Sequence, residues 1–298
     1  MEPEFGLMPA VAAAVALALL WIGEGLAPLF GTGRVERWGA RLKHLVLAGL
    51  NAGVSSVFAG ATLGVTLWSW SADFGLLHHL RPSGADPLWG ALAVSLVGVV
   101  LLDLWHYVFH VLAHKVPVLW RFHVLHHNAD HLEATAAMRF HAAEIAVQCA
   151  LSLPVYALLG LTIYEVLVYQ LVLLPVALFH HADLRLPRWL ERSLRVVIVT
   201  PGMHVVHHSR WERETDSNYS AVLSVWDRLF GSYRWREDVS GVDVGIDGYG
   251  REETWTLRGM LGTGLRRAPY SPGRAPEPGS LPRALRRRDR LRGLRRRG

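Results

Sequence analysis

The stretch that decides the fold is Ile145–Phe179, IAVQCALSLPVYALLGLTIYEVLVYQLVLLPVALF, an apolar run of double length. It contains one charged residue, Glu165, and it carries Pro154 and Gly160 near its middle. A bilayer core about 30 Å thick needs about 20 apolar residues in a helix. The run is therefore long enough for two spans, and we expect a helical hairpin that turns near Gly160.

Three further apolar stretches precede this run, namely Leu7–Phe30, His44–Trp70 and Leu88–Leu102, and the last continues to Leu112. Together the stretches predict an all-α polytopic membrane protein with four transmembrane helices, or five if the last run is a hairpin. The acidic start of the chain is the wrong charge for a signal peptide, so we expect the first stretch to be a retained span. A large soluble helical core is the alternative.

Composition excludes several classes of protein. With 51% hydrophobic and 19% charged residues, the chain is not intrinsically disordered. Cys149 is the only cysteine, which excludes a disulfide scaffold, a four-thiolate zinc site and an iron–sulfur cluster.

The net charge of +6 lies in the C-terminal tail. Residues 251–298 hold 14 Arg and 4 acidic residues, a balance of +10, whereas residues 1–250 hold 17 Lys and Arg and 21 acidic residues, a balance of −4. A linker rich in Pro, Gly and Ser, Pro269–Pro282, precedes the Arg-rich end. We therefore expect a disordered tail that binds the anionic membrane surface and not nucleic acid.

Charge asymmetry between loops predicts the orientation of the spans. The loop Gly31–Lys43 holds four basic residues, whereas Ser71–Pro87 holds only Arg81. Five spans with the N-terminus outside place every basic loop, every histidine cluster and the C-terminus on the cytoplasmic side. The scarcity of lysine beside many Arg, Ala and Gly residues suggests a GC-rich, bacterial source, and hence the bacterial cytoplasmic membrane.

Histidine carries the chemical signal, because 13 of the 16 histidines fall between His106 and His208. His106, His110 and His114 are four residues apart and share one face of a helix. Two further groups, His123–His127 and His204–His208, each have the pattern H-x-x-H-H. On a helix, such a group can supply imidazoles to two metal ions from one turn. This number of imidazoles fits a dinuclear centre better than a structural zinc site.

The histidine groups and their neighbours resemble the membrane-bound fatty acid hydroxylase/sterol desaturase superfamily. The resemblance covers about Leu92 to Glu237 and rests on elements in a fixed order: Asp103, His110, His114-Lys115-Val116-Pro117, Leu119–Asn128, Arg139-Phe140-His141-Ala142-Ala143-Glu144, Phe179-His180-His181-Ala182-Asp183, Thr200–Ser209, Asn218-Tyr219 and Trp226–Gly231. Two positions depart from the family pattern: Asp183 replaces an Asn, and Val111 stands where an Arg often follows the first histidine.

The resemblance implies a set of histidine metal ligands. It also implies a set of carboxylates, each of which orients a histidine by binding the ring nitrogen that does not face the metal. His106 and His180 have no clear family counterpart, His131 is expected in a loop, and His44, His78 and His79 are expected at the membrane interface. The implied ligands are His110, His114, His123, His126, His127, His141, His181, His204, His207 and His208, with His141 either a ligand or a residue behind one, and the orienting carboxylates are Asp103, Glu144, Asp183 and Asp227.

The resemblance divides the chain into N-terminal transmembrane segments (1–90), a hydroxylase/desaturase-like catalytic domain with a helical, histidine-rich cytoplasmic cap (91–240), and a C-terminal linker and Arg-rich tail (241–298). It implies an oxidoreductase that uses two non-heme iron ions and O₂ to hydroxylate or desaturate a lipid. No heme-binding domain and no G-x-G-x-x-G fingerprint after a strand is visible in the sequence, so we expect a separate reductase or electron carrier to supply the electrons. The alternative is a membrane protein that binds or transports metal without oxygenase activity.

Overall fold

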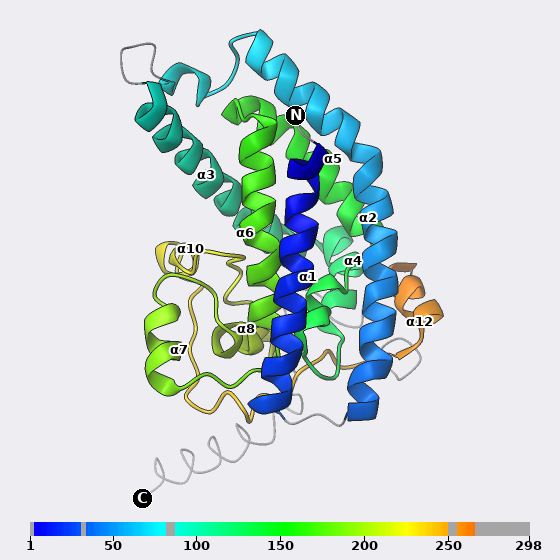
Figure 1. The fold of residues 1–298 in the computed structure, drawn as a ribbon. Helices are drawn as coiled ribbons and strands as arrows, with labels where there is room; N and C mark the ends of the chain where they lie inside the picture. The colour runs from blue at the N-terminus through cyan, green and yellow to red at the C-terminus, as the bar shows by residue number, and fades with distance from the viewer. Residues whose placement is uncertain (1–2, 31–33, 82–86, 250–254, 266–298) are drawn as a thin grey trace, which may run out of the picture.

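The computed structural model describes residues 3–30, 34–81, 87–249 and 255–265. The described residues form helices and no β-strand, with two isolated bridges, Ile198 with Leu223 and Ser209 with Val244. Five helices are long and apolar enough to cross a membrane: α1 (Pro3–Leu26), α2 (Arg34–Ser71), α3 (Pro87–Lys115), α5 (Ala142–Leu159) and α6 (Ile163–His181) (Figure 1). The expected all-α membrane fold is confirmed, with five such helices and not four.

The outer faces of these helices are apolar. On α1, the exposed side chains include Leu7, Val11, Val15 and Leu19, each more than half exposed and four residues from the next. Residues at this spacing form one stripe along a helix. A continuous apolar stripe is unfavourable in water and favourable against lipid chains, so it supports a membrane setting.

The expected hairpin turn is present and depends on two glycines. Gly160 ends α5 in the left-handed conformation, with φ +69°, and Gly75, with φ +104°, packs against it. A Cβ atom on Gly75 would lie 2.3 Å from the Gly160 nitrogen. Only glycine permits this approach of two backbones. The loop after α2 is thereby fixed against the turn between α5 and α6.

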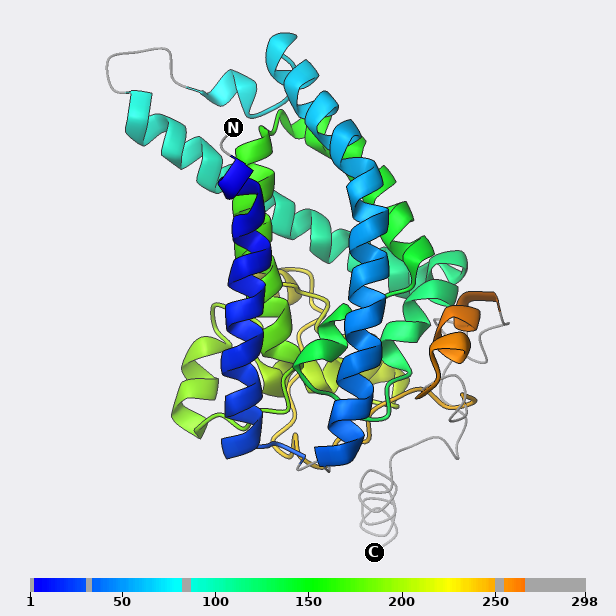
Figure 2. The same ribbon diagram turned by 45° about the vertical axis from the view of Figure 1, so that its right-hand side comes forward.

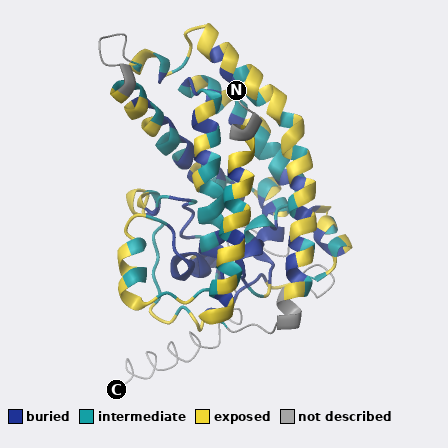
Figure 3. Cartoon of the chain, in the orientation of Figure 1, coloured by how far each residue is buried: buried dark blue, intermediate teal, exposed yellow. Residues whose placement is uncertain are grey.

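The helices pack as α1 beside α6 and α2 beside α5, while α3 crosses behind them (Figure 2). Most of the buried residues lie where α1 and α6 end, around the short helix α8 (Figure 3). The remaining elements are short: η1 (His78–Leu80), α4 (Pro117–His127), η2 (Ala134–Met138), α7 (Arg188–Leu194), α8 (Pro201–His207), α9 (Glu212–Thr215), α10 (Val225–Leu229), α12 (Leu257–Gly262) and η3 (Thr263–Leu265).

A buried ion pair ties the N-terminal helices to this end of the bundle. Glu24 of α1 accepts a hydrogen bond from Arg41 of α2 at 2.5 Å, and its other oxygen accepts one from the Ala134 backbone N–H at 2.7 Å. Arg139, after η2, donates to the Leu125 carbonyl at 2.8 Å and to the Asn128 side chain at 2.7 Å. These contacts hold the C-terminal end of α4 against α1 and α2.

The segment 241–298, expected to be a linker and tail, is described only at 241–249 and 255–265. There η3 packs on α4, and a Cβ atom on Gly264 would lie 2.4 Å from the Phe122 ring. Within the described part, this segment is therefore packed against the helical core. The Arg-rich end and Pro269–Pro282 lie outside the described residues.

Candidate metal centre

Four helices deliver histidines to one end of the bundle. α3 contributes His110 and His114 from its last two turns, and α6 ends at His181. The two H-x-x-H-H groups lie on the short helices α4 and α8, which begin at Pro117 and Pro201. Proline suits the first helical position because the N–H that it lacks has no partner there. The hydroxyl of Thr200 caps α8 by accepting from the Met203 N–H at 3.3 Å.

The imidazoles gather into two clusters, and in each the candidate ligand atoms lie within 4.8 Å of one another. Each H-x-x-H-H group divides its imidazoles between them. The clusters adjoin, because the rings of the neighbours His127 and His208 stack with centroids 4.5 Å apart. Cluster A consists of His110, His114, His123, His127 and His207, and cluster B of His126, His181, His204 and His208.

Within each cluster the rings point their Nε2 atoms toward one another. In cluster A, Nε2 of His207 lies 3.0 Å from that of His110, and Nε2 of His114 lies 3.0 Å from that of His127. In cluster B, His181 Nε2 lies 3.1 Å from His126 Nε2. Two nitrogens each about 2.1 Å from one metal ion, at a right angle, are about 3.0 Å apart. The spacing fits two histidine-bound metal ions.

The outer hydrogen bonds show why these contacts fit a cation. His110 donates from Nδ1 to the Tyr219 carbonyl at 2.8 Å, and His207 donates from Nδ1 to the Ser217 carbonyl at 2.6 Å. A neutral imidazole has one N–H, so both Nε2 atoms carry lone pairs. Two lone pairs that face each other at 3.0 Å repel unless a cation lies between them. A metal ion bound to both nitrogens provides that cation.

Burial keeps the imidazoles neutral. It lowers the pKa of His207 to about 3, although the hydrogen bond to the Ser217 carbonyl opposes the shift. Burial, followed by repulsion from neighbouring imidazolium groups, also holds the pKa values of His126, His127, His204 and His208 well below their usual range. Only the neutral ring offers a lone pair to a metal ion. These imidazoles are therefore able to bind a metal ion at neutral pH without first losing a proton.

Carboxylates contact two of the imidazoles in cluster A. Oε1 of Glu144 lies 2.6 Å from Nδ1 of His123, as expected for a residue that orients a ligand. Oδ1 of Asp216 lies 3.4 Å from Nδ1 of His114, and the Tyr219 hydroxyl donates to the same oxygen at 3.2 Å. Asp216 is not predicted from the sequence, because no motif links it to His114, 102 positions earlier.

The other three predicted orienting carboxylates accept hydrogen bonds from backbone N–H groups of the described residues. Asp103 accepts from the N–H groups of Val222 and Leu223, which lie in the loop before α10. Asp183 accepts from the N–H groups of Leu29 and Phe30 after α1, and Asp227 accepts from those of Tyr219 and Ser220. Their role is corrected from orienting ligands to holding loops, and Asp227 thereby fixes the carbonyl that His110 contacts.

His141 lies outside both clusters, so we remove it from the candidate ligands. Its Nδ1 caps α5 by accepting from the Ala143 N–H at 3.1 Å, and its Nε2 lies 3.1 Å from the Leu261 carbonyl. Both nitrogens are thus engaged by backbone. The motif places His141 directly before a helix, where a side chain that accepts a hydrogen bond is favoured.

The remaining histidines take other positions. His106 contacts its own helix, with Nδ1 3.2 Å from the Leu102 carbonyl, and His180 is buried with its ring 4.1 Å from that of His204. His131 pairs with Asp130 in a loop. His44 is not interfacial as expected, since it is buried and its Nδ1 lies 3.0 Å from Glu133.

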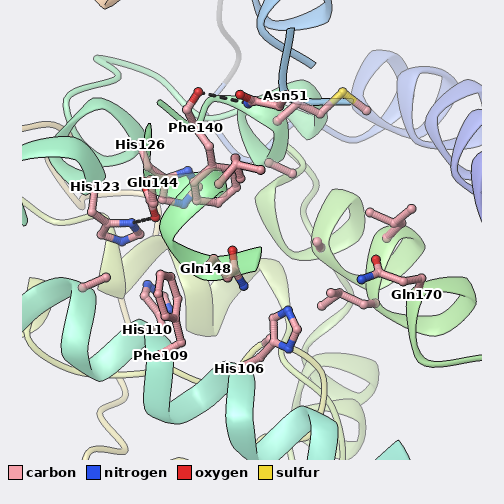
Figure 4. Close-up of a pocket in the computed structure, with 18 of the residues that line it drawn as sticks. Asn51, His106, Phe109, His110, His123, His126, Phe140, Glu144, Gln148 and Gln170 are labelled. Carbon is pink, nitrogen blue, oxygen red and sulfur yellow. Dashed lines mark hydrogen bonds and ion pairs between the residues drawn. The ribbon is translucent and has the colours of Figure 1, made fainter. Parts of the chain in front are cut away.

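A cavity of about 350 Å³ adjoins both clusters (Figure 4). It runs between α2, α3, α5 and α6, and most of its wall is apolar. His110 and His123 of cluster A and His126, His181 and His204 of cluster B lie on its surface. A cavity of this volume is large enough for part of an apolar small molecule, and imidazoles of both clusters form part of its wall.

Fold and site together define a class: polytopic helical membrane proteins with two adjoining histidine clusters, each of which could hold a metal ion. The comparison with known families agrees, because residues 95–232, which include all nine clustered histidines, match the family model described as "Fatty acid hydroxylase". The match covers 138 of the 298 residues, so this segment of the chain is similar to the fatty acid hydroxylase/sterol desaturase superfamily. No solved structure matches the chain significantly.

Several curated proteins are similar to this region. The ornithine lipid hydroxylase OlsE of Rhizobium tropici is 32% identical over 161 residues, which cover 54% of this chain and 47% of the relative. Human alkylglycerol monooxygenase is 28% identical over 44% of this chain and 28% of its own length. Human cholesterol 25-hydroxylase is 28% identical over 57% of this chain and 60% of its own length. The chain therefore spans less than two thirds of each relative.

Proposed function

We propose that this chain is a membrane-bound di-iron oxidoreductase that uses O₂ to hydroxylate or desaturate a lipid. The observation that carries the proposal is the pair of adjoining imidazole clusters, with facing Nε2 lone pairs, at the wall of an apolar cavity among membrane-spanning helices. The relatives named for ornithine lipid, alkylglycerol and cholesterol oxidation support a lipid substrate.

In this proposal each part of the chain has a defined task. Cluster A and cluster B each hold one iron ion, and the bound irons would supply O₂ activation for attack on a C–H bond. The hydrogen bonds from His110 and His207 to backbone carbonyls fix which nitrogen faces the metal. The apolar cavity wall binds the lipid chain and excludes water from the reacting carbon.

We also propose an orientation and partners. The basic loops and all the clustered histidines belong to the same end of the five-helix bundle. Positively charged loops are typically cytoplasmic, so we assign this end of the bundle to the cytoplasmic side of a bacterial membrane. A separate reductase or electron carrier delivers two electrons there, and the Arg-rich tail holds that face to anionic lipid. Metal transport is less well supported, because both clusters lie at the end of the bundle and not at its middle.

Isotope labelling tests the function. Cells that express the wild-type chain under ¹⁸O₂ are expected to accumulate a hydroxylated lipid that carries the heavy isotope, or a desaturated lipid that forms only with O₂. Comparative lipid mass spectrometry, with cells that lack the chain and cells grown without O₂ as controls, gives the measurement. A lipid product that forms equally without O₂, or no chain-dependent product under O₂, would refute the proposal.

A further inference from the structure

The chain contains only two glutamines, Gln148 and Gln170, and both line the cavity beside the metal clusters. Gln148 lies on α5 and Gln170 on α6, within the candidate membrane spans. In Figure 4 both side chains extend into the space that His106 also faces. Neither amide forms a hydrogen bond with another residue in the part of the chain that the structure describes.

An amide without a partner is costly inside a membrane. Transfer of an amide from water to a hydrocarbon without a compensating hydrogen bond costs several kcal/mol. Polar side chains in membrane spans therefore face cavities and tend to mark binding sites. Two unpartnered amides that face one cavity indicate a ligand that supplies hydrogen-bonding atoms there.

The amides lie close to the reacting end of the cavity. Gln148 is one turn, about 6 Å along α5, from Glu144, which contacts His123 of cluster A. His106 is one turn from His110 along α3. Gln170 and His106 line the same cavity, and the ring of Tyr169, the residue before Gln170, is 4.9 Å from the His106 ring. Gln148, Gln170 and His106 thus line the part of the cavity next to the imidazole clusters.

The charges of the cavity restrict the ligand to a neutral group. Among the described residues that line the cavity, Glu144 is the only carboxylate, with Oε1 2.6 Å from His123 Nδ1, and none is Lys or Arg. At the two amides, a carboxylate or phosphate would meet no cationic side chain among the described lining residues, whereas a neutral group needs none there. A glutamine amide both donates and accepts, so it suits a hydroxyl, ether, ester or amide.

We propose that Gln148 and Gln170 bind a neutral, oxygen-bearing group of the lipid and thereby fix which carbon faces the metal clusters. The substrate class is a lipid with a hydroxyl, ether, ester or amide inside the cavity, and neither a free fatty acid carboxylate nor a plain hydrocarbon. This inference rests on the proposed function for the identity of its ligand as the substrate.

Photolabelling of the full chain in detergent tests the binding. The probe is a long-chain primary amide with a terminal diazirine, and the competitors are the unlabelled amide, the alkane and the carboxylate of equal length. For the wild type, we expect the amide to displace the probe from α5 and α6 peptides at about tenfold lower concentration than the other two, as two neutral hydrogen bonds predict.

In the Gln148→Leu, Gln170→Leu double variant, that preference is expected to fall to within about threefold. Leu174→Met, which changes the apolar lining of the same cavity, is the matched control and should keep the preference. Where an oxygenated product forms, Gln148→Leu should also move the modified position along the chain at unchanged iron content, a shift that a purely structural role would not cause.

Equal displacement by amide and alkane in the wild type would overturn the inference, and so would an undiminished preference in the double variant. Either result would indicate that the two amides form hydrogen bonds with water in the cavity and not with a lipid group. A wild type that selects the amide but forms neither a hydroxylated nor a desaturated lipid would contradict the proposed function and leave the binding of a neutral group intact.

Discussion

Replacement of His207 by alanine is expected to remove iron from the protein and to abolish turnover. His207 belongs to cluster A, and its Nε2 faces that of His110 at 3.0 Å. Loss of a residue that merely orients a ligand lowers metal affinity or activity 10- to 100-fold, so loss of a ligand should lower activity by more than about 100-fold. His126→Ala makes the same change in cluster B. Metal analysis and lipid turnover of the purified variants give the measurement.

The matched control for both variants is His131→Ala. His131 pairs with Asp130 in a loop outside both clusters, so its loss should leave iron content and turnover near those of the wild type. A His207→Ala or His126→Ala protein that stays active without iron would contradict the di-iron mechanism. Unchanged iron in both variants would show that the clusters do not bind it.

The second large effect concerns Asp103, whose replacement by alanine is expected to destabilise the fold. Its carboxylate accepts hydrogen bonds from the Tyr169 hydroxyl at 3.0 Å, the Val222 and Leu223 N–H groups at 3.1 and 2.9 Å, and the Trp226 indole at 2.8 Å. Each buried donor left without an acceptor costs about 1–3 kcal/mol. The expected loss is therefore about 4 kcal/mol or more of the free energy of unfolding.

Thermal unfolding of the detergent-solubilised protein measures this effect. A loss of 4 kcal/mol should lower Tm by about 8 °C or more. The control is Asp243→Ala, which removes an exposed carboxylate 3.1 Å from Arg210 and should change stability by less than about 1 kcal/mol. If Asp103→Ala unfolds at the temperature of Asp243→Ala, the carboxylate does not hold the loop before α10.

The sequence predicts the helices well because their signal is local. Apolar length marks the spans, and Gly160 marks the hairpin turn, since only a residue tolerant of positive φ ends α5 in this way. Helix geometry indicates that each H-x-x-H-H group can serve two metal ions, but not which imidazoles go together: the structure groups His123 with His127 and His204 with His208, and not the first histidine with the one three positions later.

Residue types do not predict which distant groups they meet. Asp103 lies among the histidine motifs, yet its partners are Tyr169 on α6, 66 positions later, and residues 119 to 123 positions later in the loop before α10 and at the start of α10. His44 precedes an apolar stretch and is therefore expected at the membrane interface. In the structure it is buried instead, in contact with Glu133 and Arg139. The unpartnered state of Gln148 and Gln170 depends on four helices that enclose one cavity, and no local pattern carries that information.

The iron content of the purified wild-type chain tests the central claim most directly. We expect two iron ions per chain, since cluster A and cluster B each supply enough neutral imidazoles for one ion. An active preparation that holds no iron, or one ion per chain, would contradict a dinuclear centre built from these nine histidines.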